Sequence, residues 1–182
     1  MNTALIVIDV QESFRLQPAW ADISEPEIAA RVARVVEHGR DRGDEIVWVL
    51  HAEPGSGGLF DPDRGLVVLQ PGLEAREGET TLVKTSHNAF TTTRLQQLLT
   101  LRGVTRLRLV GIRTEQCVET TARLGSDLGY DVEVVIDATA THPLPLHDGS
   151  GVLPAGDVIA RTAAALSGRF ARIVTAADVM AS

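Results

Sequence analysis

The fold of this chain is limited most by a series of short apolar runs that are rich in Val, Ile and Leu and do not alternate with polar residues. Such runs are typical of strands buried on both faces of a parallel sheet, because a strand with one wet face would alternate. No run is long enough to span a membrane. The runs cover residues 4–8, 45–50, 107–112, 132–136 and 172–175, with a weaker one at 81–83.

Segments with helical periodicity separate these runs. One opens at Ser24-Glu-Pro-Glu27, which matches a capping box, and continues to about residue 42. Strands that alternate with helices predict an α/β fold, with a mostly parallel, doubly wound sheet between two layers of helices. The other helical segments are 92–101, 115–128 and 154–166, and a glycine suited to a helix stop follows each of the four: Gly43, Gly103, Gly129 and Gly168.

Composition fits one globular domain that spans residues 1–182. The net charge of −7 leaves no basic patch to neutralise phosphates, so nucleic acid is not an expected partner. The N-terminal segment lacks the basic start and long apolar stretch of a signal peptide, and we expect a cytoplasmic protein with no membrane partner. The single cysteine excludes an intrachain disulfide and a metal cage built of several cysteines.

That cysteine, Cys117, lies shortly after the 107–112 run. Thr114 is a candidate N-cap, which would place Cys117 in the first turn of a helix. Unpaired backbone N–H groups and the positive end of the helix dipole would there lower the pKa of the thiol. A lone cysteine can equally be a small, inert, buried hydrophobic residue, and the spacing alone leaves both interpretations open.

Polar residues stand at the carboxyl ends of the predicted strands, where open parallel sheets bind ligands. Burial would raise the pKa of Asp9 unless a cation is near; the alternative is an aspartate that caps a turn beside a solvated Gln11. Lys84 is either an ordinary surface charge or the partner of Asp9 and of a thiolate. Asp137 is expected to end its strand and cap the following turn. The residues at this edge are Asp9, His51, Lys84, Cys117 and Asp137.

Two irregular stretches, 52–79 and 142–151, could close over a site at this edge. The first is rich in glycine and proline and is longer than an ordinary connection. Long loops in compact domains often carry function, although an irregular surface excursion is the alternative. Trp20 and Phe60 also lie in irregular segments, and could cover a pocket or be buried in a subunit contact.

Asp9, Lys84 and Cys117, in this order on an α/β sheet, resemble the isochorismatase-like cysteine hydrolase superfamily. The resemblance covers nearly the whole chain and implies a six-stranded parallel sheet flanked by helices. The family includes nicotinamidases, N-carbamoylsarcosine amidases, ureidoacrylate amidohydrolases and isochorismatases. Four blocks carry the resemblance: Ile8-Asp-Val-Gln-Glu-Ser-Phe14, Val83-Lys-Thr-Ser-His-Asn-Ala-Phe-Thr-Thr-Thr-Arg-Leu95, Val110-Gly-Ile-Arg-Thr-Glu-Gln-Cys-Val-Glu-Thr-Thr-Ala122 and Gly129-Tyr-Asp-Val-Glu-Val-Val-Ile-Asp-Ala-Thr-Ala-Thr141.

The resemblance implies a role for each residue of the Asp-Lys-Cys triad. Cys117 would attack an amide or ureido carbonyl, and Asp9 would take the thiol proton and pass it to the leaving amine. Lys84 would orient Asp9 and stabilise the thiolate, and water would then cleave a thioester. Backbone N–H groups of Arg113 and Cys117 would hold the oxyanion, with the bond from Ile112 to Arg113 in the cis form.

The resemblance also narrows the substrate class. Members that hydrolyse the vinyl ether of isochorismate typically lack the cysteine, so Cys117 favours cleavage of a C–N bond. Nicotinamidases usually hold a metal through an Asp-x-His pair and further histidines after the second strand. Only His51 and Glu53 stand in that region here, and two ligand candidates do not make a metal site. A metal-assisted nicotinamidase is therefore kept only as an alternative.

Further pocket candidates come from an aromatic residue and the loop histidines. Phe14 matches an aromatic position that lines the pocket in relatives, and its alternative is a core or hinge contact. His87 follows Lys84 closely, although a lone loop histidine is more often exposed or structural than catalytic. His142 and His147 come after it as candidates.

Two other function classes remain as alternatives. A non-catalytic binding domain on the same fold would have no need of Asp9, Lys84 and Cys117 together. A nucleotide- or flavin-binding protein would carry a G-x-G-x-x-G or P-loop after its first strand, and Val10-Gln-Glu-Ser stands there instead. We expect no organic cofactor, no obligatory metal and a small-molecule substrate. By resemblance we expect a homo-oligomer, either a dimer or a tetramer.

Overall fold

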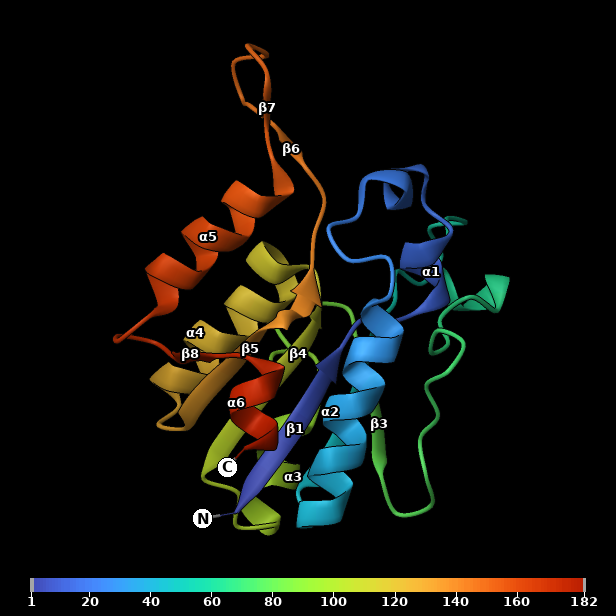
Figure 1. Cartoon of the computed structure of the whole chain (residues 1–182). Coiled ribbons are helices and arrows are strands. Elements are labelled where there is room, and N and C mark those ends of the chain that lie inside the picture. The colour runs from blue at the N-terminus through green and yellow to red at the C-terminus, as the bar shows by residue number, and fades with distance from the viewer. Residues whose placement is uncertain (1, 182) are drawn as a thin grey trace.

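A six-stranded parallel sheet forms the centre of the molecule in the computed structural model, which describes residues 2–181 (Figure 1). Its strands fall on the six predicted apolar runs, and every neighbouring pair is parallel. The predicted α/β fold with a doubly wound sheet is therefore confirmed. In sheet order, the strands are β3 (Thr80–Lys84), β2 (Glu45–His51), β1 (Thr3–Ile8), β4 (Arg106–Ile112), β5 (Asp131–Ala140) and β8 (Arg172–Val174).

Helices cover both faces of the sheet, because successive residues of the central strands point to opposite faces and both sets are apolar. In β1, Leu5 and Val7 belong to a core with helices α2 (Ile28–Arg42) and α6 (Ala176–Met180). Ile6 and Ile8 belong to the core on the other face, which the remaining long helices complete. Those helices are α3 (Leu95–Leu101), α4 (Glu119–Asp127) and α5 (Ala155–Leu166).

The strand order places β1 in the middle, with β2 and β3 on one side and β4 and β5 on the other. Doubly wound sheets form a ligand crevice where the order changes direction, beyond the carboxyl ends of the strands. The structure therefore brings the predicted polar residues to the edge at which such sheets bind ligands.

The start of α2 differs from the sequence prediction, whereas its end does not. Gly43 follows Arg42 in the left-handed conformation and ends the helix as predicted. The predicted capping box is wrong, since α2 begins at Ile28 with no side-chain cap. The Ser24 hydroxyl instead accepts the N–H of Thr141 at 3.1 Å, so it serves the carboxyl edge of the sheet.

The prediction for Asp137 is also wrong. Strand β5 continues past it to Ala140, because the register between β4 and β5 shifts after Leu109 and pairing resumes at Gly111. The Asp137 carboxylate accepts the N–H of Ala176 at 2.8 Å, and so supports the start of α6 rather than the turn after its own strand.

The two irregular stretches behave differently. Residues 142–151 lead into a hairpin of β6 (Leu144–Pro145) and β7 (Val152–Leu153), which projects beyond the helices and does not close over the sheet edge (Figure 1). The 52–79 stretch includes the short helix η2 (Pro62–Arg64) and is fixed to the segment after β1 by a β-bridge between Gln11 and Leu69. Two short helices follow β1, α1 (Glu12–Arg15) and η1 (Pro18–Asp22). None of the helices in the described range has the length and apolar character needed to cross a membrane.

Candidate active site

Asp9 is the first residue after β1 and is fully buried. Its N–H donates to the Val49 carbonyl at 2.8 Å, and its φ of 56° lies in the left-handed region that few residues other than glycine adopt. Its carboxylate Oδ2 lies 2.8 Å from Lys84 Nζ. Asp9 is thus the partner of a buried cation and not the cap of a solvated turn. Gln11, which the turn-cap alternative would place in solvent, is fully buried as well.

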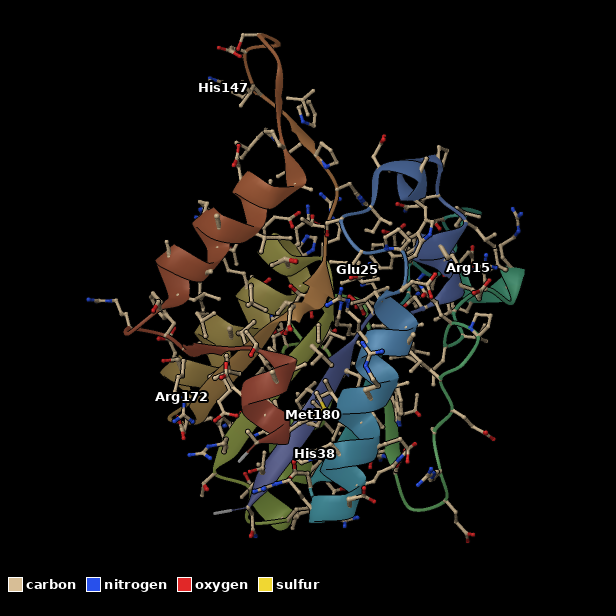
Figure 2. The ribbon with its side chains drawn as sticks, in the orientation of Figure 1. Arg15, Glu25, His38, His147, Arg172 and Met180 are labelled. Atoms are coloured by element: carbon tan, nitrogen blue, oxygen red, sulfur yellow. The ribbon has the colours of Figure 1, made fainter. Side chains whose placement is uncertain are left out.

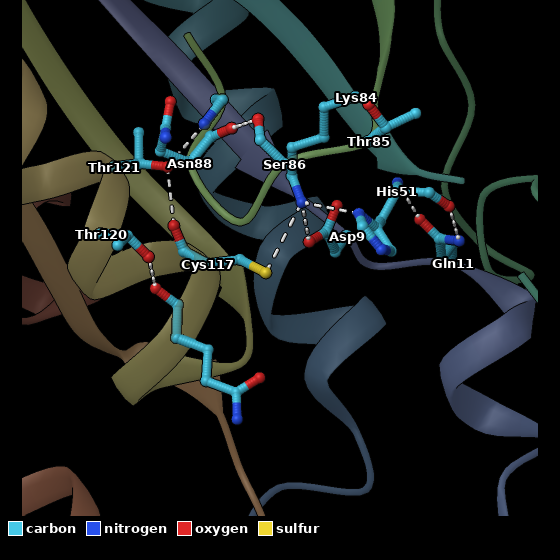
Figure 3. A network of polar contacts seen from close by, with 12 residues as sticks. Asp9, Gln11, His51, Lys84, Thr85, Ser86, Asn88, Cys117, Thr120 and Thr121 are labelled. Carbon is cyan, nitrogen blue, oxygen red and sulfur yellow. Dashed lines mark hydrogen bonds and ion pairs between the residues drawn. The ribbon is translucent and has the colours of Figure 1, made fainter. Parts of the chain in front are cut away.

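Lys84 is the last residue of β3 and is also fully buried, which excludes the surface-charge interpretation. Besides Asp9, its Nζ lies 3.5 Å from Cys117 Sγ and 3.4 Å from His51 Nδ1 (Figure 3). A protonated lysine has three N–H donors and no acceptor, so these three neighbours account for its full capacity. The short contact to Asp9 is a buried ion pair.

Cys117 lies in a π-helical turn, η3 (Thr114–Val118), that joins β4 to α4. The turn begins at Thr114, so the prediction of Thr114 as N-cap is wrong; the Thr114 hydroxyl donates to Thr139 Oγ1 at 2.9 Å. The Thr121 hydroxyl donates to the Cys117 carbonyl at 2.6 Å. The peptide bond from Ile112 to Arg113 is cis, as the resemblance implied.

The pKa of the Cys117 thiol is raised to about 12, opposite to the direction expected from a helix start. Burial is the main cause, and the nearby Asp9 carboxylate adds to it, while Lys84 acts in the other direction. The cysteine is only 5% exposed, so loss of hydration outweighs the helix dipole. The Cys117 thiol is therefore neutral at pH 7.

Burial also raises the pKa of Asp9, although the charge of Lys84 offsets part of the rise. A carboxylate that is poorly hydrated binds a proton more readily than one in water. Asp9 can therefore take the thiol proton at the moment of attack, so a preformed thiolate is not required.

His51 is fixed by a side chain that the sequence prediction overlooked. Gln11 Oε1 accepts the His51 N–H at 2.7 Å, and Gln11 Nε2 donates to the His51 carbonyl at 2.9 Å. This amide pairs with the end of β2 as a neighbouring strand would. The signal was present in the sequence, because Gln11 follows Asp9 by two residues on the segment that leaves the sheet.

The residues around His51 do not fit a metal site. Its Nδ1 faces the Lys84 ammonium and its Nε2 lies 3.5 Å from Glu53 Oε1. A cationic neighbour disfavours a second cation at the same nitrogen. Within residues 2–181 there is no group of three or more His, Cys, Asp or Glu side chains placed to hold a metal ion.

Aromatic side chains line the His51 side of the cluster. The Phe60 ring packs edge-on against His51, with centroids 5.6 Å apart, and against Phe14 at 4.8 Å. Phe14 and Phe60 are both 8% exposed. Phe14 and Phe60 belong to the core on the α2 side of the sheet, and Trp20 packs part-buried against the same core. Phe14 reaches the candidate site only through Phe60.

The other predicted histidines have unequal positions. His87 is exposed in the loop after β3, and the structure records no contact between it and the Asp-Lys-Cys cluster. His147 lies on the projecting hairpin (Figure 2). His142 is buried, with neither ring nitrogen hydrogen-bonded, and its pKa is lowered by burial and by Arg113. His142 is thus better placed near this edge than His87.

A cavity of about 490 Å³ lies at the opposite edge of the sheet, where β5 and β8 begin. Its lining includes Tyr130, Phe170 and Arg172 but none of the Asp-Lys-Cys cluster. The Arg172 guanidinium is already paired with Glu133. This cavity contains no cysteine, histidine or lysine that could serve as nucleophile or base, and the buried cluster is the better candidate for an active site.

Comparisons with known proteins agree with the geometry. The family model for the isochorismatase domain matches residues 3–152. The isochorismatase family protein YddQ of Bacillus subtilis is 33% identical over 177 residues, which is 96% of this chain and 97% of that protein. A streptothricin hydrolase of Streptomyces noursei is 32% identical over 84% of this chain and 60% of its own length. The ureidoacrylate amidohydrolase RutB of Methylorubrum extorquens is 28% identical, over 81% and 74%.

A solved structure shows the same architecture. The crystal structure of a putative isochorismatase-family hydrolase from Chromobacterium violaceum superposes with a TM-score of 0.92 at 28% identity, over 99% of this chain and 92% of that one. Because the family model covers most of the chain and the relatives align across nearly all of it, the chain belongs to the isochorismatase family.

Proposed function

We propose that the protein is a cysteine hydrolase that cleaves an amide or ureido C–N bond of a small molecule. The observation that carries this proposal is the buried cluster in which Lys84 Nζ lies 2.8 Å from Asp9 Oδ2 and 3.5 Å from Cys117 Sγ. A nucleophile, a base and a cation that holds both are the parts of nucleophilic catalysis.

The first half-reaction makes a thioester. The Cys117 thiol passes its proton to Asp9 as Sγ attacks the substrate carbonyl carbon. Backbone N–H groups of Arg113 and Cys117 hold the oxyanion of the tetrahedral intermediate. When the C–N bond breaks, Asp9 gives the proton to the leaving nitrogen.

The second half-reaction restores the enzyme. Water gives a proton to Asp9 and adds to the thioester carbonyl, and the C–S bond then breaks. The sulfur recovers the proton from Asp9, leaving a carboxylic or carbamic acid product. Lys84 keeps the Asp9 carboxylate within reach of the sulfur and offsets negative charge as it moves between the two groups.

The relatives support a hydrolase of this kind, since one is named a streptothricin hydrolase and another a ureidoacrylate amidohydrolase. A binding domain is the main alternative. Burying an ion pair costs several kcal/mol of desolvation per ion, which its attraction often fails to recover. A domain that only bound ligands would gain little from holding Asp9 and Lys84 beside a thiol.

The test is trapping of the covalent intermediate. The protein is incubated with a panel of small amides and N-carbamoyl compounds, quenched within seconds, and examined by intact mass and peptide mapping. We expect an acyl adduct on Cys117, together with ammonia or amine release that Cys117→Ala abolishes and Asp9→Asn lowers by at least about a hundredfold. Turnover that persists in Cys117→Ala would refute the proposal.

A further inference from the structure

His51 is a polar neighbour of Lys84 for which the proposed reaction has no role. The two are register partners at the carboxyl ends of β2 and β3. Their side chains meet beyond the strand ends, with Nδ1 of His51 3.4 Å from Nζ of Lys84 (Figure 3). Lys84 links His51 to the reacting groups, because the same ammonium also contacts Asp9 and Cys117.

The chemistry of the contact fixes the state of the imidazole. The lysine ammonium can only donate, so Nδ1 must present a lone pair and carry no proton. The ring proton of the neutral form is then on Nε2, which lies 3.5 Å from Glu53 Oε1. The Nδ1–H tautomer and the doubly protonated cation would both set a proton against the ammonium.

The surroundings hold the ring in this place. The Gln11 amide makes two hydrogen bonds to the backbone of His51, and the Phe60 ring packs edge-on against the imidazole. A side chain held on both its backbone and its ring loses little further freedom when it contacts Lys84. This is the arrangement expected of a group that positions another.

We propose that His51 is a positioning residue, which as a neutral imidazole accepts the third proton of Lys84 and so keeps the ammonium between Asp9 and Cys117. The inference rests on the proposed hydrolase function and adds that the cluster requires a neutral His51. Protonation of His51 would replace an acceptor with a like charge, and Lys84 would have to move away from it. Acid would therefore remove the acceptor that His51 offers to Lys84.

The charged groups that face His51 are Lys84 at the end of β3, Asp9 after β1 and Glu53 two residues further along its own segment. Burial lowers the pKa of His51 and Lys84 lowers it further, while Asp9 and Glu53 oppose the shift. The imidazole is consequently neutral at pH 7, and the cluster is intact there. The acceptor for Lys84 is lost as the pH drops through this lowered pKa.

The first experiment observes the imidazole directly in the full-length protein. Nitrogen-15 NMR of the histidine side chains reports which ring nitrogen carries the proton and at what pH the second proton binds. We expect His51 as the Nε2–H tautomer at pH 7, with its pKa below the ordinary histidine value of about 6.5. Replacing Lys84 by Met should raise the His51 pKa, because the charge of Lys84 lowers it. An Nδ1–H tautomer, or a charged ring at pH 7, would overturn the proposal.

The second experiment measures the effect on the nucleophile, with iodoacetamide as the probe. His51→Leu removes the acceptor and should slow alkylation of Cys117 at pH 9 by about tenfold, because Lys84 is held less firmly near the sulfur. His51→Asn offers an amide oxygen in a similar position and should stay within about twofold of wild type. His147→Asn, on the projecting hairpin, is the matched control and should have no effect. Equal rates in His51→Leu and His51→Asn would remove the positioning role.

The two proposals fail in different ways. If amide turnover persists in Cys117→Ala, the hydrolase mechanism is wrong, and the NMR tautomer still tests the contact between His51 and Lys84. If turnover requires Cys117 but His51→Leu matches wild type in alkylation, the hydrolase mechanism stands and the role of His51 falls.

Discussion

The raised pKa of Cys117 can be tested without knowing the substrate. It shifts from 9.0, an ordinary thiol value, to about 12. At pH 8 the thiolate fraction then falls from about one in ten to about one in ten thousand, so alkylation by iodoacetamide should be about a thousandfold slower than for an ordinary thiol. The shift corresponds to about 4 kcal/mol of preference for the neutral thiol.

Two substitutions should move this rate in opposite directions. The negative charge of Asp9 raises the thiol pKa, so Asp9→Asn should speed alkylation at pH 8 by about tenfold while it lowers turnover. Lys84 lowers the thiol pKa, so Lys84→Met should slow alkylation by a similar factor. The assay is the pseudo-first-order rate of Cys117 modification from pH 6 to pH 11, followed by mass spectrometry.

Two results would refute this reasoning. A wild-type thiol that titrates below the free value of about 8.5 would mean that the helix start outweighs burial. Equal alkylation rates across the pH range in the wild type, Asp9→Asn and Lys84→Met proteins would mean that neither charge affects the thiol pKa. The second result would also leave Cys117 as an ordinary buried cysteine and favour the binding-domain alternative.

Three further perturbations test the frame around the site. A Cβ on Gly111, which has a φ of 125°, would lie 1.9 Å from the carbonyl oxygen of Ile8, so Gly111→Ala should lower the free energy of unfolding in urea by more than about 3 kcal/mol; an unchanged midpoint would contradict the packing. Gln11→Leu leaves backbone groups of His51 unpaired and should cost about 1–3 kcal/mol in the same assay, unless water replaces the amide. Because the thiol pKa is raised in the folded state, the stabilisation from the neutral thiol is complete below the unfolded pKa and is lost as the pH rises toward about 12. Between pH 9 and 12, the free energy of unfolding of the wild type should therefore fall by up to about 4 kcal/mol more than that of Cys117→Ala. Equal pH dependence of unfolding in the two proteins would contradict the raised pKa.

The sequence predicted the parts of this fold that depend on local pattern and on one topological rule. Continuous apolar runs mark strands buried on both faces, and parallel strands bring their carboxyl ends to one edge. Those two facts were enough to predict that Asp9, His51, Lys84 and Cys117 lie together at one edge of the sheet. The contacts of Lys84 show that the collection is close enough for hydrogen bonding.

The errors arose where a distant residue competes with a local motif. Ser24 matched a capping box, but its hydroxyl instead accepts a hydrogen bond from the N–H of Thr141, 117 residues away in sequence. Asp137 looked like a strand end, although the shifted register of β4 and β5 carries the strand further. The sequence left the direction of the thiol pKa shift open for a related reason: position at a helix start can be read from the sequence, whereas the degree of burial depends on the whole fold.

Four neighbouring strands each contribute one group to the cluster: Lys84 from β3, His51 from β2, Asp9 after β1 and Cys117 after β4. Each group alone would be costly to bury, and an apolar set of similar volume would stabilise this crevice at least as well. Stability therefore gives no reason for an ammonium, a carboxylate, an imidazole and a thiol to share one buried site. Their chemistry does, because a base that binds protons tightly can take one from a neutral thiol only while a fixed cation offsets the charge that moves between them.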